Sequence, residues 1–459
     1  MPQRMVVIGA DAAGMSAASQ ARRLRGPEDL EIVAFERGRF TSYSACGIPY
    51  WISGLVADHQ ELIVRDPETF RRDHHIDVRI RHGVTRIDLD NREVVATSFN
   101  DGGREVRESF DTLVYATGAV PAHPPWADTA TLGVFGVQTL DDGAALRDWL
   151  DQDDPPRRAV VVGGGYIGVE MAEALIRRGL AVTLVERSQQ PMSTVDPDMG
   201  ALVRAALVGL GIDVRTGTSV TGVHERDGRV SEVLTDDGAL PADVVVLGLG
   251  VRPNTALAEQ AGLPLGVTGG VRTDLQMRVV GKPDVWAAGD CVETFHRISG
   301  QPVHVPLGTH ANKQGRVAGI NIGGSYATFP GVIGTAVTKV CDLEVARTGL
   351  LEREATQAGY ACVAVSVESN SRAGYFPDAA PMTIKLIAEQ HTGQLLGAQI
   401  VGKSEAAKRI DVLSVAVWNR MSVAEMTALD LGYAPPYSPV WDPVLVAARR
   451  ANDAVANTP

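Results

Sequence analysis

Residues 159–186 read AVVVGGGYIGVEMAEALIRRGLAVTLVE and combine an apolar run, a glycine-rich turn, a helical pattern and a second apolar run. Gly163, Gly165 and Gly168 have the G-x-G-x-x-G spacing that brings backbone N–H groups against a pyrophosphate at a helix N-terminus. Glu186 ends the second run, where a carboxylate accepts hydrogen bonds from a ribose hydroxyl. The stretch therefore predicts a βαβ unit that binds a dinucleotide.

The same order of features occurs near the N-terminus. An apolar run over 5–8 leads into GADAAG at 9–14, a helical pattern follows, and the run EIVAFE ends at Glu36. Asp11 stands where the motif has its middle glycine, so this unit taken alone is also compatible with a βαβ unit that binds nothing. Together the two units form an internal repeat, which predicts two nucleotide-binding domains.

Composition restricts the possible partners. The chain has 459 residues, enough for two to four domains, and a formal net charge of −12. An acidic chain of this kind disfavours nucleic acid and anionic membranes as partners. No apolar run approaches the 18 or so residues of a membrane span, and a strand-like run follows the N-terminus at once. We expect a cytoplasmic protein.

The rest of the chain adds strands and a different third domain. DTLVYATGAVP at 111–121, ADVVVLGLGVRPNT at 242–255 and DVWAAGDCVE at 284–293 are apolar runs that break into small-residue turns. The stretch 141–158 is predicted to be loop-rich. From about Gly331 onward, strand-like runs precede helical stretches, which is typical of an α+β domain.

The four cysteines favour chemistry by a single thiol over any paired arrangement. Cys46, Cys291, Cys341 and Cys362 include no two closer than 21 residues, so neither a C-x-x-C motif nor a metal-ligand spacing occurs. Cys46 lies among small residues in TSYSACGIPYWISG, at 41–54, and precedes a predicted helix. A thiol near a helix N-terminus has a lowered pKa and is nucleophilic, although an isolated cysteine can also be an inert apolar residue.

Taken together, the two glycine turns and the turns VYATG and WAAGD resemble the FAD- and NAD(P)H-dependent pyridine nucleotide-disulfide oxidoreductases. TSYSACGIPY resembles the signature of their single-cysteine branch, which contains coenzyme A disulfide reductases, persulfide and polysulfide reductases, and NADH oxidases and peroxidases. The resemblance implies an α/β fold with two Rossmann-like domains and a C-terminal α+β dimerisation domain. Their expected limits are 1–118 with 252–328 for FAD, 119–251 for NAD(P)H and 329–459 for dimerisation.

The resemblance also implies the cofactor contacts, and no metal. For FAD we expect Gly9, Ala10, Gly14, Glu36, Arg37, Thr117, Gly118, Asp290, Leu307 and Thr309. For NAD(P)H we expect Gly163, Gly165, Tyr166, Ile167, Gly168, Glu170 and Glu186. The carboxylate of Glu186 suits the free ribose hydroxyl of NADH, whereas Arg187 and Ser188 leave NADPH open.

Within the branch, particular positions bear on the substrate. Oxidases and peroxidases carry a histidine where this chain has Ala12. The resemblance to coenzyme A disulfide reductases assigns coenzyme A contacts to Gln20, Arg23 and Ser42. It also implies a homodimer in which Tyr375 and Tyr433 of the partner subunit approach Cys46. Ala45 replaces the asparagine usual in those reductases, which leaves the identity of the substrate open.

The expected activity is reduction of a small disulfide, or of a persulfide or polysulfide, by NAD(P)H through FAD and a mixed disulfide on Cys46. Coenzyme A disulfide is the first candidate substrate. Two alternatives remain at this stage. One is an NADH oxidase that reduces O₂ through a Cys46 sulfenate. The other is an electron-transfer reductase for a partner protein, in which Cys46 has only a structural role.

Overall fold

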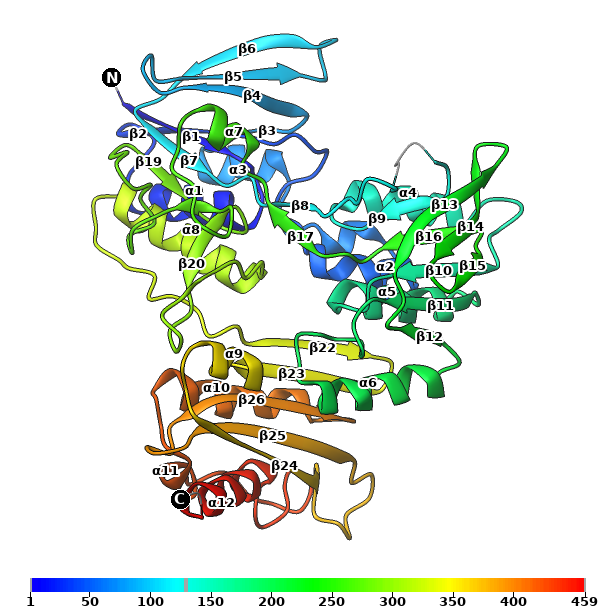
Figure 1. Cartoon of the computed structure of the whole chain (residues 1–459). Helices are drawn as coiled ribbons and strands as arrows, with labels where there is room; N and C mark the ends of the chain where they lie inside the picture. Colours follow the sequence, from blue (N-terminus) through cyan, green and yellow to red (C-terminus); the bar gives the residue numbers. More distant parts are fainter. Residues whose placement is uncertain (1, 128–130, 458–459) are drawn as a thin grey trace.

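The computed structural model describes residues 2–127 and 131–457, which form three lobes (Figure 1). The N-terminal lobe contains a five-stranded parallel sheet of order β19-β7-β1-β2-β3. Its strands are β1 Gln3–Ile8, β2 Leu30–Phe35, β3 Asp77–Arg79, β7 Thr112–Tyr115 and β19 Val285–Ala287. Its helices are α1 Ala12–Leu24, α3 Pro67–His74, α7 Ala256–Gln260 and α8 Gly308–Ile322, whereas α2 Ile48–Ile52 packs against α4 (Leu140–Leu150) and α5 (Tyr166–Arg177) of the second lobe (Figure 1).

The second lobe repeats this plan with a parallel sheet of order β12-β11-β10-β16-β9. Its strands are β9 Val134–Gly136, β10 Arg158–Val162, β11 Ala181–Glu186, β12 Asp213–Thr216 and β16 Val244–Leu247, and its helices are α4 Leu140–Leu150, α5 Tyr166–Arg177 and α6 Pro197–Gly209. The central strands of both sheets are buried on both faces, and for that reason their sequences are continuous apolar runs.

The chain crosses between the two lobes twice, at neighbouring places. β8 Ala119–Pro121 leads into the second lobe, β17 Val251–Pro253 leads back, and the two pair antiparallel. Smaller antiparallel ribbons extend both lobes: β4 His82–Asp88, β5 Glu93–Ser98 and β6 Arg104–Ser109 in the first, and β13 Val220–Arg226, β14 Arg229–Thr235 and β15 Gly238–Pro241 in the second. The first also holds β18 Val271–Arg272, β20 Val292–Phe295 and β21 Pro302–Val303.

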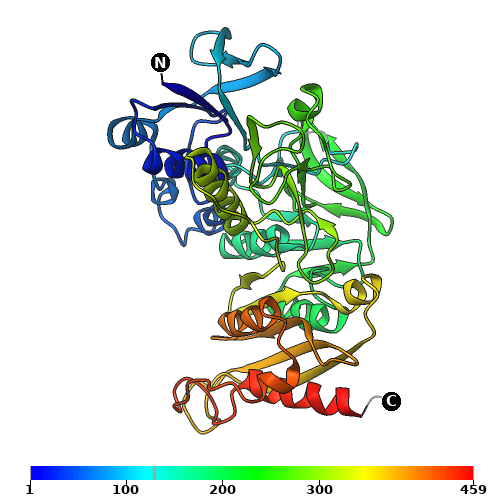
Figure 2. The same ribbon diagram turned by 90° about the vertical axis from the view of Figure 1, so that its left-hand side faces the viewer.

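The third lobe is an antiparallel sheet of order β22-β23-β26-β25-β24, followed mainly by helices. Its strands are β22 Ala336–Val340, β23 Leu343–Gly349, β24 Cys362–Asn370, β25 Pro381–Glu389 and β26 Leu395–Gly402. Its helices are α9 Glu352–Gln357, α10 Ile410–Trp418, α11 Val423–Met426 and α12 Pro443–Ala456. This lobe is the predicted α+β domain, and it lies at one end of the molecule (Figure 2).

Glycines allow the two long helices of the first lobe to pack closely. A Cβ at Gly315 of α8 would lie 2.1 Å from the carbonyl oxygen of Ala13, and one at Gly319 would lie 2.4 Å from that of Ala17. Both distances are far below van der Waals contact, so only glycine fits at these positions. The close packing brings the N-terminus of α8 beside the glycine turn that precedes α1.

One prediction from the sequence is wrong. Most of the stretch expected to be loop-rich forms α4, which begins after Thr139. The side chain of Thr139 accepts a hydrogen bond from the Asp142 N–H, and the Asp142 carboxylate accepts one from the Thr139 N–H. This capping box, together with burial of Leu140, Leu146 and Leu150, stabilises the helix despite its acidic residues.

The described residues contain neither a membrane-spanning helix nor a disulfide. None of their helices is both long and apolar enough to cross a membrane. The four cysteines all lie within the described ranges and form no disulfide.

Candidate active site

The first glycine turn forms a cradle between β1 and α1. A Cβ at Gly9 would lie 2.1 Å from the carbonyl oxygen of Ala116, and one at Gly14 would lie 2.0 Å from that of Gly9. Glu36 accepts hydrogen bonds from the N–H groups of Ala10, at 3.0 Å, and Gly38, at 2.8 Å. Burial raises the pKa of the Glu36 carboxyl. The turn therefore has the open backbone, and an acid at the end of the second strand, that are typical of a dinucleotide-binding unit.

Three further segments lie against this cradle. Thr117 and Gly118 follow β7, and Gly118 has a φ of +67°. A Cβ at Gly289 would lie 2.8 Å from that of Ala13, which brings the neighbouring Asp290 close to the start of α1. Burial raises the pKa of the Asp290 carboxyl. Leu307 and Thr309 lie at the start of α8, and Gln314 of that helix accepts a hydrogen bond from the Gly289 N–H at 2.8 Å.

The second glycine turn has the same geometry. A Cβ at Gly163 would lie 2.4 Å from the carbonyl oxygen of Gly248, and one at Gly168 would lie 1.9 Å from that of Gly163. Glu186 accepts hydrogen bonds from the N–H groups of Gly164 and Ser188, both at 2.7 Å. Gly165 precedes α5, whose first residues are Tyr166 and Ile167. All seven predicted residues of this unit lie in or beside the turn and α5.

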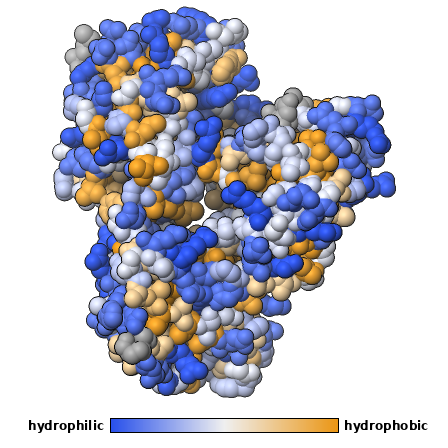
Figure 3. Space-filling view, in the orientation of Figure 1, coloured by the Kyte–Doolittle hydropathy of each residue, from blue (hydrophilic) through white to orange (hydrophobic). Residues whose placement is uncertain are grey.

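Cys46 lies between the two cradles. It occupies a short 3₁₀ turn, Ala45–Gly47, and is exposed to solvent in the single chain. The surrounding protein partly desolvates the thiol, which raises its pKa. The negative charges of Glu170 and Asp290 raise the pKa of the thiol as well. Glu170 belongs to α5 of the second unit, and Asp290 follows β19 of the first, so carboxylates of both units contribute to the electrostatic environment of the thiol. Figure 3 shows that the surface is hollowed where the three lobes meet.

The predicted lowering of the Cys46 pKa is wrong, because burial raises it. The helix that follows Cys46, α2, has only five residues, and its dipole is correspondingly weak. Desolvation, followed by the carboxylates of Glu170 and Asp290, disfavours the thiolate and raises the pKa of Cys46.

The loop that carries Cys46 is bonded to the first glycine turn. The Tyr43 N–H donates to Asp11 Oδ1 at 3.2 Å, and the Thr41 hydroxyl donates to the carbonyl oxygen of Ala10. Ser42 lies between these two contacts with a φ of +51°. Sequence reasoning treated Asp11 only as a departure from the glycine motif, whereas the structure gives it a partner in the cysteine loop.

Asp11→Asn is expected to stabilise the cofactor-free protein at neutral pH. Burial and the nearby Glu36 raise the Asp11 pKa to about 7, well above the 3.8 or so of a free aspartate. The folded state therefore binds a proton that the unfolded chain has released, so stability falls between about pH 4 and pH 7, by roughly 4 kcal/mol in total. Asparagine keeps an oxygen that can accept from Tyr43 and carries no charge. Urea unfolding of both proteins should give equal stabilities near pH 4 and a widening gap up to pH 7; a constant gap would contradict this explanation.

The two predicted substrate contacts on α1 differ in their surroundings. Gln20 is half-buried, and its Cβ would lie 2.8 Å from a Cβ at Gly319 of α8. Arg23, three residues later, is exposed. Arg37 is also exposed and lies beside Gly83 of β4.

The two predicted tyrosines lie in loops of the C-terminal lobe, away from α2 (Figure 1). Tyr375 is in the loop between β24 and β25, and Tyr433 is in the loop between α11 and α12; they are 78% and 49% exposed. Desolvation, together with the neighbouring Tyr375, raises the pKa of Tyr433. A single chain therefore brings the tyrosines together but does not bring them to Cys46.

The C-terminal lobe is bonded directly to α5. The Thr338 hydroxyl of β22 donates to Glu170 Oε1 at 2.6 Å, and the Cys341 N–H donates to Glu173 Oε2 at 2.6 Å. Burial raises the pKa of Glu170. Sequence reasoning missed Thr338 and Glu173. Glu173 could have been noticed in the sequence, because it is a carboxylate within an otherwise apolar helical pattern and therefore needs a polar partner.

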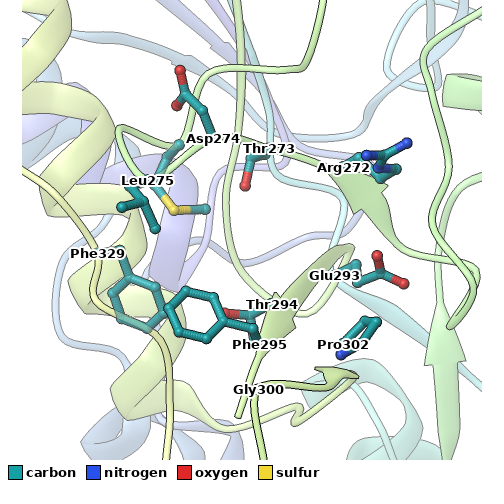
Figure 4. Close-up of a pocket in the computed structure, with 11 residues that line it drawn as sticks. Arg272, Thr273, Asp274, Leu275, Glu293, Thr294, Phe295, Gly300, Pro302 and Phe329 are labelled. Atoms are coloured by element: carbon teal, nitrogen blue, oxygen red, sulfur yellow. The ribbon is translucent and has the colours of Figure 1, made fainter. Parts of the chain in front are cut away.

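A separate pocket lies on the N-terminal lobe and contains none of the predicted site residues (Figure 4). Its volume is about 270 Å³. Phe295 and Phe329 lie together on one side beside Leu275, and Arg272 and Glu293 lie on the other. The Glu293 carboxylate accepts hydrogen bonds from the N–H and hydroxyl of Thr268, so it is engaged within the protein.

Comparison with known proteins identifies the family. Residues 3–315 match the model of the pyridine nucleotide-disulphide oxidoreductases, and residues 335–443 match the dimerisation domain of the same family. The chain belongs to the pyridine nucleotide-disulphide oxidoreductases. It is an FAD-dependent oxidoreductase that uses NAD(P)H.

Three relatives extend over almost the whole chain. A CoA-dependent NAD(P)H sulfur oxidoreductase of Pyrococcus furiosus is 36% identical over 97% of this chain and 98% of its own. An NADH oxidase of Methanocaldococcus jannaschii is 35% identical over 99% and 100%, and a coenzyme A disulfide reductase of Staphylococcus haemolyticus is 30% identical over 98% and 100%. Among solved structures, an NAD-dependent persulfide reductase from A. fulgidus is 39% identical, with a TM-score of 0.95 over 99% of this chain and 84% of that one.

Proposed function

We propose that this oxidoreductase reduces a low-molecular-weight disulfide, with coenzyme A disulfide or a related persulfide or polysulfide as substrate, through a mixed disulfide on Cys46. The observation that carries the proposal is one exposed thiol that joins the two dinucleotide units: its loop is bonded to the first glycine turn, and the helix that follows it, α2, packs against α5 of the second unit. A thiol there can exchange electrons with a flavin on one side and meet a substrate from solvent on the other. The names of the sulfur and coenzyme A disulfide reductases among the relatives support the same substrate class.

The domain limits and cofactor residues predicted from the sequence form part of the proposal. FAD would bind the domain formed by 1–118 and 252–328, NAD(P)H would bind 119–251, and 329–459 would dimerise; the sheet composition and the β8–β17 crossing support this division. The FAD residues would be Gly9, Ala10, Gly14, Glu36, Arg37, Thr117, Gly118, Asp290, Leu307 and Thr309. When bound, FAD accepts a hydride from the nicotinamide and supplies two electrons to sulfur.

NADH is the proposed nicotinamide cofactor. The Glu186 carboxylate is held by two backbone N–H groups, and it would repel a 2′-phosphate while accepting from a free hydroxyl. Gly163, Gly165 and Gly168 would receive the pyrophosphate, and Tyr166, Ile167 and Glu170 would face the nicotinamide from the first turn of α5.

The sulfur chemistry follows from Cys46 as a nucleophile. Its thiolate attacks one substrate sulfur, the substrate S–S bond breaks, and a Cys46–sulfur bond forms while a thiolate leaves. The partner subunit's Tyr433 or the partner subunit's Tyr375 would supply a proton to that leaving group. Two electrons then cleave the mixed disulfide and a second thiol leaves, so one disulfide, one NADH and one proton give two thiols and NAD⁺. Gln20, Arg23 and Ser42 would hold the coenzyme A.

A homodimer is required by this scheme, because one chain leaves the tyrosines far from its own thiol. The dimerisation domain of the family matches this part of the chain. Its loops also expose large apolar side chains that a second copy would cover: Tyr375, Tyr433, Tyr437, Val440 and Trp441, each between 49% and 78% exposed. We further propose a cytoplasmic location, since an exposed catalytic thiol requires a reducing compartment.

The test is a panel of acceptors with the FAD-loaded enzyme. Under anaerobic conditions, NADH should be consumed only when coenzyme A disulfide, pantethine or polysulfide is added, and mass spectrometry of the quenched enzyme should find the substrate thiol on Cys46. An NADH oxidase remains the second candidate because a relative bears that name. Rapid NADH consumption in air without any disulfide would favour the oxidase, and turnover with protein acceptors alone would overturn the proposal.

A further inference from the structure

The two loops that carry the exposed tyrosines contain little regular structure of their own. The first, 371–380, joins β24 to β25 and is closed by the Ser371 N–H, which donates to the carbonyl oxygen of Ala380 at 2.8 Å. The second, 433–442, leads into α12 and is joined to the first by the Ala373 N–H, which donates to the carbonyl oxygen of Pro435 at 3.2 Å. A single backbone bond between two exposed loops does not by itself define the relative position of two phenols.

One guanidinium contacts both loops. Arg409 lies just before α10, and Nη2 donates to the carbonyl oxygens of Ser371, at 2.7 Å, and Tyr437, at 2.8 Å. Nη1 donates to the carbonyl oxygen of Glu405 at 2.8 Å, and Nε faces Asp442 Oδ2 at 3.4 Å. The Arg409 side chain is only 11% exposed. Every nitrogen of the side chain is therefore engaged in a largely buried, fixed geometry.

Asp442 extends this arrangement to the end of the second loop. Its Oδ1 accepts from the Val444 N–H at 2.8 Å and so caps α12. Its Oδ2 accepts from the Ser438 hydroxyl at 3.0 Å and faces Arg409. The second loop is thus held between the cap of α12 and the guanidinium.

We propose that Arg409 is a positioning residue for disulfide reduction: it joins the two loops so that Tyr375 and Tyr433 are presented together to the thiol of the other subunit. This inference rests on the proposed function, which gives those phenols the proton that the leaving thiolate needs. Proton transfer depends steeply on placement, and a shift of about 1 Å costs on the order of a hundredfold in rate. An Arg409 that only stabilised the fold would have no selective effect on the sulfur step.

The experiment compares Arg409→Lys with Arg372→Lys in the full-length, FAD-loaded enzyme. Lysine keeps the charge but cannot donate to two carbonyls and a carboxylate in the fork geometry of arginine. Arg372 is the matched control, because it contacts Glu405 and the carbonyl oxygen of Pro377 but not the second loop. Arg409→Lys should lower kcat with coenzyme A disulfide by about 10- to 100-fold, while NADH-dependent ferricyanide reduction and the dimer seen by sedimentation stay as in the wild type. Arg372→Lys should keep kcat within about twofold.

A double-mutant comparison separates positioning from structure. In a Tyr375→Phe, Tyr433→Phe background, Arg409→Lys should cause no further loss, because the phenols through which it acts are gone. A full additional loss there, a parallel loss of ferricyanide reduction, or dissociation of the dimer would overturn the inference. Should Arg409→Lys not fold, Asp442→Asn removes the charge facing Nε and retains a good N-cap, and it should lower kcat in the same selective way.

The outcomes also separate this inference from the proposed function. A wild-type enzyme that reduces no disulfide overturns both. A wild-type-like rate in the Tyr375→Phe, Tyr433→Phe enzyme overturns the assigned proton donors and the inference with them. Impaired tyrosine variants together with an unimpaired Arg409→Lys overturn the inference alone.

Discussion

Cys46→Ser is expected to lose disulfide-dependent NADH oxidation by at least about a thousandfold while retaining NADH-dependent reduction of ferricyanide. A serine hydroxyl is not ionised near neutral pH, and it cannot form the mixed disulfide through which the electrons reach the substrate. The substitution is nearly isosteric, and Cys46 is exposed, so the fold and the two glycine cradles should be unaffected. The measurement is anaerobic NADH oxidation with coenzyme A disulfide, followed by the same assay with ferricyanide.

Cys362→Ser is the matched control for this variant. Cys362 is a partly buried thiol at the start of β24, in the C-terminal lobe, and its substitution should leave both activities as in the wild type. Retention of disulfide turnover by Cys46→Ser would remove the thiol from the mechanism. The electron-transfer alternative, with a structural Cys46, would then be the better explanation.

Lys385→Met is expected to lower the free energy of unfolding by about 3–5 kcal/mol, the usual cost of removing one partner of a buried ion pair. Lys385 is 5% exposed, and its ammonium contacts the carboxylates of Asp196, at 3.3 Å, Asp198, at 2.8 Å, and Glu352. Burial lowers the pKa of Lys385. The hydrogen bonds to Asp198 and Glu352 and the charge of Asp196 raise that pKa by more than burial lowers it, so the net shift is upward. Without the ammonium, Asp196, which is 3% exposed, would be left without a counter-charge.

The position of this ion cluster adds to the expected effect. Asp196 and Asp198 lie at the start of α6 in the second lobe, whereas Lys385 and Glu352 belong to the C-terminal lobe. Gln399 strengthens the same junction: Oε1 accepts from the Asp196 N–H at 2.7 Å, and Nε2 donates to Asp196 Oδ2 at 2.6 Å. Loss of Lys385 should therefore loosen the contact between two lobes as well as destabilise each.

Denaturation by urea at neutral pH measures this prediction, with Lys403→Met as the control. Lys403 is 55% exposed and pairs with Asp342, which is 69% exposed. An exposed pair of this kind contributes at most about 1 kcal/mol. Equal destabilisation by the two variants would show that the buried cluster has no special role.

Much of the fold could be predicted from the sequence because its requirements are local. Gly9, Gly14, Gly163 and Gly168 are positions where any Cβ would meet a backbone oxygen, so the glycines themselves mark the two cradles. The parallel strands are buried on both faces, so their sequences are continuous apolar runs that can be recognised without the structure. Glu36 and Glu186 follow their strands at a spacing set by the βαβ unit. The α4 helix was missed because its cap, Thr139 with Asp142, lies at the edge of a stretch that composition alone describes as polar.

The sequence by itself determined the two dinucleotide units, the α+β third domain and the single candidate thiol, since each rests on neighbouring residues and fixed spacings. Only the tertiary structure decided which groups surround that thiol, that burial and the carboxylates of Glu170 and Asp290 raise its pKa, and that Arg409 and Lys385 each join segments far apart in the chain. The physical reason is that desolvation and charge interactions depend on distances in space, and no local pattern of residues encodes those distances.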